Sequence, residues 1–217
     1  MFTFAELMFL LSIDDARGTT ANEIIYRAMY YGLAGALLTD LVVQDKAVIE
    51  GKLVSLNDNT LTGDKLLDKS LELIKVAKKP RKPEHWVRVL PTLNLPQLIV
   101  DSLVAKSVLM MDEKHYKLVI PFEVYGEKKA SAKYWVKQHL RAIVFADKIV
   151  EPQDVILLNL LKSCSLLKLV FTRDERRAAQ MKVEELNASV EIDPQEFDIL
   201  ASINSTLNTL VAASTAN

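Results

Sequence analysis

The chain has 217 residues, of which 50% are hydrophobic and 25% charged, and its formal net charge is −1 at pH 7. This content is ample for a core and predicts one domain over residues 1–217, while the near-zero charge argues against a protein that is basic throughout. The single cysteine, Cys164, excludes an internal disulfide and favours a reducing, cytoplasmic setting.

The first two helices are predicted from capping residues that precede apolar residues at helical spacing. Thr3 and Glu6 have the spacing of a capping box, and a second box at residues 20–23 opens a helix that runs to about Val43. Within that helix, apolar residues cover most of the circumference of residues 32–41, so we expect neighbours on all sides. Two glycines in this stretch, at 32 and 35, favour a close approach by another element.

Two short hairpins and further helices follow. The first hairpin is centred on residues 50–51, and the second pairs residues 107–111 with 116–120. Asp64 and Asn94 are predicted N-caps of helices that end near Ala77 and Lys106. Pro152 opens an apolar helix followed by residues 166–171, and a charged helix covers 174–186 before a last helix at about 194–213. The predicted fold is mostly α: a helical bundle around a central apolar helix, with two short β-hairpins.

Residues that could carry catalysis or bind a metal are scarce. The three histidines, His85, His115 and His139, form no His-Glu-x-x-His arrangement, and no glycine-rich phosphate loop is present. Cys164 lies at the end of an apolar helix, where a cysteine usually behaves as a small buried hydrophobe. We therefore predict no catalytic residues, no metal site and no cofactor.

Two groups of basic residues could meet an anionic partner. Lys129, Lys133, Lys137 and Arg141 fall four apart, which places them on one helix face that is either a membrane contact or simply solvated. The second group surrounds Trp86 in a proline-broken segment, and either contacts phosphates or head groups or forms a solvated linker. Its members are Lys75, Lys78, Lys79, Arg81, Lys82 and Arg88.

The second hairpin is more apolar than a small exposed hairpin requires. It therefore packs on the body of the protein, mediates self-association or touches a membrane. The residues that predict an oligomer or membrane contact are Leu109, Met110, Leu118, Ile120 and Phe122.

Five segments carry a resemblance to a known family: Ala5-Glu6-Leu7-Met8-Phe9-Leu10-Leu11-Ser12-Ile13-Asp14-Asp15, Tyr31-Gly32-Leu33-Ala34-Gly35-Ala36-Leu37-Leu38, Thr62-Gly63-Asp64-Lys65-Leu66-Leu67-Asp68, His85-Trp86-Val87 and Leu103-Val104-Ala105-Lys106-Ser107-Val108-Leu109. Taken together and in order, they resemble the Golgi phosphoprotein 3 family over about residues 3–186, so the chain is identified as a prokaryotic member that shares the core domain. The resemblance implies a helical bundle around an apolar helix, with a protruding hairpin. Eukaryotic members are peripheral membrane proteins that bind phosphatidylinositol 4-phosphate and act as adaptors that retain glycosylation enzymes in the Golgi.

The lipid pocket of that family is substituted here. Where relatives place a tryptophan and an arginine, this chain holds Ile25 and Ala34, and two further arginine positions hold Leu93 and Pro96. None of these side chains offers a hydrogen-bond donor to a phosphomonoester, so phosphoinositide-specific binding is not expected.

The resemblance thus implies a non-enzymatic, cytoplasmic binding or adaptor protein, peripheral at an anionic membrane surface or bound to a protein partner. Self-association through the second hairpin is a further expectation. The alternative is a winged-helix-like nucleic-acid-binding protein, because a helix followed by a two-stranded hairpin fits that fold too. The net charge of −1 supplies little attraction for phosphates and makes nucleic acid the less favoured partner.

Overall fold

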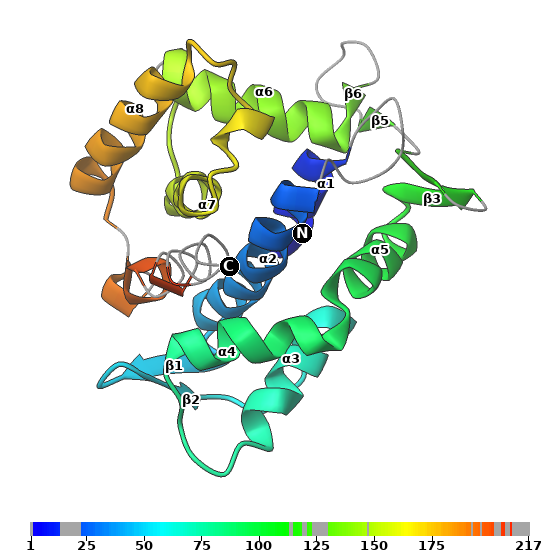
Figure 1. Ribbon diagram of the computed structural model, residues 1–217, viewed down its shortest axis with the longest axis vertical. Helices are drawn as coiled ribbons and strands as arrows, with labels where there is room; N and C mark the ends of the chain where they lie inside the picture. Colours follow the sequence, from blue (N-terminus) through cyan, green and yellow to red (C-terminus); the bar gives the residue numbers. More distant parts are fainter. Residues whose placement is uncertain are drawn as a thin grey trace.

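Helix α2 (Glu23–Val43) runs through the middle of the protein, with the other helices arranged around it (Figure 1). The second predicted helix is therefore confirmed in type and in its end at Val43. Of its predicted capping box at 20–23, residues 20–22 and the side chain of Glu23 lie outside the described residues. The computed structural model describes residues 2–13, 23–112, 115–118, 121–122, 130–146, 148–191, 193–195, 197–201, 205–206 and 209.

The central part of α2 is buried on every side. All nine residues from Gly32 to Asp40 are buried, as the continuous apolar circumference predicts. A Cβ at Gly32 would lie 2.6 Å from the Cys164 sulfur and 3.1 Å from Met8 Cε, so this glycine is required for close packing. The helices in contact with α2 are α1 (Phe4–Ser12), α3 (Lys65–Lys75), α4 (Pro83–Val89), α5 (Leu95–Ala105) and α7 (Pro152–Ser163).

Two of the predicted helix caps form as expected and a third does not. Thr3 and Glu6 make both bonds of a capping box, and Asp64 Oδ1 accepts the Leu66 and Leu67 N–H groups. Asn94 occupies the N-cap position of α5 after a 3₁₀ turn (Leu90–Leu93), but its side chain makes no capping bond. Its left-handed backbone, with φ of 53°, explains the residue type instead, because asparagine tolerates that conformation.

The short strands form separate antiparallel pairs. Strands β1 (Ala47–Glu50) and β2 (Leu53–Leu56) confirm the first hairpin, but its turn is at Gly51 and Lys52, one residue later than predicted, and both turn residues have positive φ. Strands β3 (Leu109–Asp112) and β4 (His115–Leu118) confirm the second, with a shorter connection than predicted because Asp112 pairs with His115. A further two-residue pair, β5 (Pro121–Phe122) with β6 (Ala130–Ser131), was not predicted.

The helices divide into two sets on either side of α1 and α2. In Figure 1, α3, α4 and α5 lie below and to the right, whereas α6 (Ala132–Phe145), α7 and α8 (Arg176–Ser189) lie above and to the left. The stretch 166–171 forms only a 3₁₀ turn (Leu167–Leu169). After Asp193, whose carboxylate accepts the Gln195 N–H at 2.8 Å, residues 194–195 and 197–201 are helical. The mostly α fold class is confirmed.

In the part of the chain that the structure describes, none of the helices is both long enough and apolar enough to cross a bilayer.

Candidate functional site

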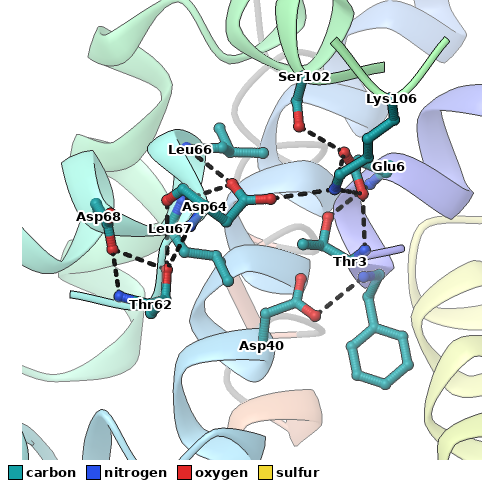
Figure 2. Close-up of polar contacts among 11 residues, drawn as sticks. Thr3, Glu6, Asp40, Thr62, Asp64, Leu66, Leu67, Asp68, Ser102 and Lys106 are labelled. Atoms are coloured by element: carbon teal, nitrogen blue, oxygen red, sulfur yellow. Dashed lines mark hydrogen bonds and ion pairs between the residues drawn. The ribbon is translucent and has the colours of Figure 1, made fainter. Parts of the chain in front are cut away.

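An ionic cluster around the buried Glu6 joins three of the segments that carry the family resemblance (Figure 2). Glu6 on α1 has a fully buried side chain and accepts both Lys106 Nζ, at 2.7 and 2.8 Å, and the Ser102 hydroxyl, at 2.7 Å. Its Oε2 also accepts the Thr3 N–H at 2.8 Å. The cluster therefore ties the start of α1 to the end of α5, 100 residues away along the chain.

Lys106 extends the cluster to α3. Its ammonium lies 3.1 Å from Asp64 Oδ2, while the other Asp64 oxygen caps α3. Burial alone would lower the pKa of Lys106, but the bonds to Glu6 and Asp64 outweigh it and raise the pKa. Asp68 then accepts both the N–H and the hydroxyl of Thr62 at 2.7 Å, which orders the loop before α3.

Asp40 adds a second buried carboxyl beside this cluster. Its Oδ1 accepts the Phe4 N–H at 3.0 Å, and its Oδ2 is buried without a hydrogen-bond partner among the described residues. Burial raises the pKa of Asp40 well above its usual range, because the charged form would lose its hydration. Asp40 therefore keeps its proton to a higher pH than an exposed aspartate does.

The cluster is arranged for structure rather than for proton transfer. A general base needs a free lone pair facing a substrate, whereas both Glu6 oxygens already accept protein donors inside the core. Within the described ranges, no three His, Cys, Asp or Glu side chains are placed to hold a metal ion. The sequence predicted the capping roles of Glu6 and Asp64 but not that both carboxylates bind Lys106. The only sequence signal for this contact was the presence of charged residues inside apolar segments.

Cys164, which was predicted to be unreactive, is buried, and the rings of His85 and His139 pack against tryptophan rings. Cys164 is 3% exposed, and burial raises its pKa to about 12, so it packs as a hydrophobe, as expected. His139 stacks on Trp135 and lies 2.7 Å from Asp154 Oδ1. His85 meets the edge of Trp86, and the side chain of His115 lies outside the described residues.

The predicted basic stripe runs along α6, but its members have different surroundings. Arg141 forms a two-pronged ion pair with Glu175, at 2.6 and 2.5 Å, and lies over the Phe145 ring. Lys133 donates to the Ile13 carbonyl oxygen at the end of α1. Lys137 is half-buried, and Lys129 lies outside the described residues. Two of the four cations therefore bind other groups of the protein itself.

The predicted contact residues of the second hairpin are only partly described. Leu109 is buried, with 1% exposure, whereas the adjacent Met110 is 56% exposed. Leu118 and Phe122 lie in strands β4 and β5, but their side chains, like the whole of Ile120, fall outside what the structure describes.

Three of the four substituted lipid-pocket positions have described side chains. Ala34 is completely buried in the middle of α2, and Leu93 is half-buried against the core. Pro96 is half-buried in the first turn of α5. The Ile25 side chain lies outside the described residues, although its backbone is helical. Neither a guanidinium nor an indole is therefore present at the three described positions.

The architecture is that of a mostly helical domain organised around one buried helix, with an ionic cluster around the buried Glu6 joining its motif segments. The family model for Golgi phosphoprotein 3 (GPP34) matches residues 4–202. The chain therefore belongs to the Golgi phosphoprotein 3 family, a family of non-enzymatic binding and adaptor proteins.

Proposed function

We propose that this chain is a non-enzymatic binding or adaptor protein that associates peripherally with an anionic membrane surface on the cytoplasmic side. The observation that carries the proposal is the family match over residues 4–202. The contacts predicted from the sequence are the α6 stripe and the second hairpin. Of their described side chains, Met110 is exposed, Leu109 is buried, and the stripe residues Lys133, Lys137 and Arg141 are half-buried.

The attraction is to membrane charge in general rather than to phosphatidylinositol 4-phosphate. A phosphomonoester is bound tightly by planar guanidinium donors, and Ala34, Leu93 and Pro96 carry no donor at all. Because Ala34 is enclosed by the core, no neighbouring side chain can substitute for a donor at that point without repacking α2.

Vesicle sedimentation tests the function directly. The full chain is mixed at low salt with phosphatidylcholine vesicles, with and without phosphatidylserine, and with a third set whose phosphatidylinositol 4-phosphate supplies the same total charge. We expect equal binding to both anionic sets, none to the neutral set, and release when the salt is raised, because screening shortens to about 3 Å at 1 M. Failure to sediment with either anionic set at low salt would contradict the proposal.

A nucleic-acid titration covers the alternative class. Micromolar or tighter binding to duplex DNA at low salt, together with indifference to the anionic vesicles, would favour a winged-helix-like protein instead.

We also propose that the second hairpin mediates self-association. Light scattering should report a multimer that Met110→Glu dissociates without unfolding, because Met110 is exposed in strand β3. The matched control is Leu109→Glu, which places a charge at the adjacent buried position and should unfold the protein. A wild-type protein that is monomeric in light scattering would contradict self-association through the hairpin.

A further inference from the structure

The segment that runs from the end of α3 through the connection into α4 concentrates positive charge in a chain whose net charge is slightly negative. The fourteen residues from Lys75 to Arg88 contain six lysines and arginines and one acidic residue, Glu84. This stretch, the cationic turn, therefore has a net charge of +5 in a chain of net charge −1, and the remainder carries −6.

All six cations of the cationic turn are exposed and unpaired. The stretch is described throughout, and none of the six side chains forms a hydrogen bond or ion pair with another described residue. They are Lys75, Lys78, Lys79, Arg81, Lys82 and Arg88. This distinguishes the cationic turn from the α6 stripe, where Arg141 and Lys133 have protein partners.

The backbone that carries these cations is anchored. The Arg81 carbonyl oxygen accepts the Val54 N–H of β2 at 2.7 Å, in an isolated antiparallel bridge. Pro83 is buried in the first turn of α4, and Pro80 restricts φ within the turn. A solvated linker needs no such attachments, whereas a binding surface loses less conformational entropy when its backbone is already fixed.

Exposed apolar groups accompany the cations, but the nearby aromatic ring is hidden. Val76 is 66% exposed between Lys75 and Lys78, and Leu53 of β2, next to the bridge, is 37% exposed. Trp86 is only 2% exposed, so its ring cannot stack on a nucleic-acid base.

We propose that the cationic turn is the surface through which this protein contacts an anionic bilayer, an inference that rests on the membrane association proposed above. The turn lies at the lower end of the molecule, opposite α6 along its longest dimension (Figure 1). A flat anionic surface can meet this end alone, whereas a long polyanion would also pass over surface whose summed charge is negative. Charge complementarity and the exposed Val76 together favour a bilayer as the occupant.

Three variants test the assignment, of which the turn and control variants each remove three positive charges and the α6 variant removes two. The turn variant carries Lys78→Gln, Lys79→Gln and Lys82→Gln. The control variant removes the same charge from exposed residues of the other half, with Lys168→Gln, Arg173→Gln and Arg177→Gln. The α6 variant carries Lys129→Gln and Lys137→Gln. Partition onto phosphatidylserine-containing vesicles is measured at about 0.1 M salt, where screening acts over about 10 Å, with thermal unfolding to show that each variant is folded.

We expect the turn variant to bind roughly a hundredfold more weakly than wild type, since each cation near an anionic leaflet is worth roughly fivefold in affinity. The control and α6 variants should stay within about threefold of wild type, because charges far from the contact are screened over about 10 Å. The turn variant's affinity should also depend less steeply on salt.

The outcomes separate this inference from the function on which it rests. A wild type that ignores the vesicles overturns the proposed function itself. A wild type that binds, with a turn variant no weaker than the control, overturns only the assignment to the cationic turn. A loss confined to the α6 variant places the contact at the other end. Loss of duplex DNA binding in the turn variant, with vesicle binding unchanged, makes the turn a nucleic-acid surface instead.

Discussion

The α6 stripe and the cationic turn are both groups of basic residues in the sequence, but in the structure their side chains have different surroundings. The stripe has regular four-residue spacing, but Arg141 is paired with Glu175 on α8 and Lys133 is bonded to the end of α1. The cations of the cationic turn do not follow a regular four-residue spacing, yet all six are exposed and none has a partner among the described residues. Regular spacing places charges on one face of a helix, but it does not say whether that face meets solvent or another helix.

The difference follows from what each segment packs against. Helix α6 contacts α1 and α8, so cations along its sides reach carbonyl oxygens and carboxylates of those neighbours. The cationic turn lies at an end of the molecule, where its backbone and the buried side chains of Pro83, Trp86 and Val87 meet the body, while its cations are exposed. Four measurements, from the largest expected effect to the smallest, can sharpen or break this contrast.

The largest effect is expected at the junction that holds the cationic-turn half together. Lys106→Met should destabilise the protein by about 3 kcal/mol, because it leaves the Glu6 carboxylate buried without its counter-ion. Adding Glu6→Gln should recover part of the loss. Urea unfolding measures both, with Lys69→Met, at an exposed position on α3, as a control expected to change stability by less than about 0.5 kcal/mol. An equal effect at both lysines would contradict a structural role for the cluster.

The junction of the other half is the contact between Gly32 and Cys164. Gly32→Ala should cost about 1–2 kcal/mol, because the added Cβ would lie 2.6 Å from the Cys164 sulfur. In a Cys164→Ala background the same change should be neutral or stabilising, since alanine favours the helix and the sulfur is gone. Additive effects in this double-mutant cycle, followed by chemical denaturation, would show that the approach of α7 to α2 is looser than described.

The pH dependence of stability should differ between a variant of Arg141, which is paired with Glu175, and variants of the cationic turn. The Arg141 guanidinium and a backbone N–H hold the pKa of Glu175 at about 2, below its usual 4.5. This depressed pKa stabilises the folded state above about pH 4.5, and the contribution is lost as pH falls through about 2.

Arg141→Gln should therefore lower the free energy of unfolding near neutral pH. The difference in unfolding free energy between this variant and wild type should disappear as the pH falls through about 2. Lys78→Gln should show no gap at any pH, because Lys78 has no partner among the described residues. A pH-independent gap for Arg141→Gln would argue against the ion pair as its cause.

The smallest effect is expected for single cations at the membrane. Lys78→Gln should weaken vesicle binding roughly fivefold, whereas Lys137→Gln on α6 should change it less than about twofold. The reverse order would restore the α6 contact predicted from the sequence.

Local features of the fold could be predicted well. The capping box at Thr3 and Glu6, the cap at Asp64 and the end of α2 at Val43 follow from residue types a few positions apart. Asn94 shows the limit of such rules, because the residue suits both a side-chain cap and a left-handed backbone. The β5–β6 pair could not be predicted, since its two-residue strands carry no periodic signal.

By itself, the sequence determined the mostly helical class, the buried central helix and the family, because each depends on short-range periodicity or on ordered motifs. Only the tertiary structure decided which charges are free. The partner of Glu6 is 100 residues away and that of Arg141 is 34 residues away, distances over which periodicity carries no information. Folding brings those groups together and leaves the cations of the turn in solvent, so the surface available to an anionic partner is a property of the packed chain.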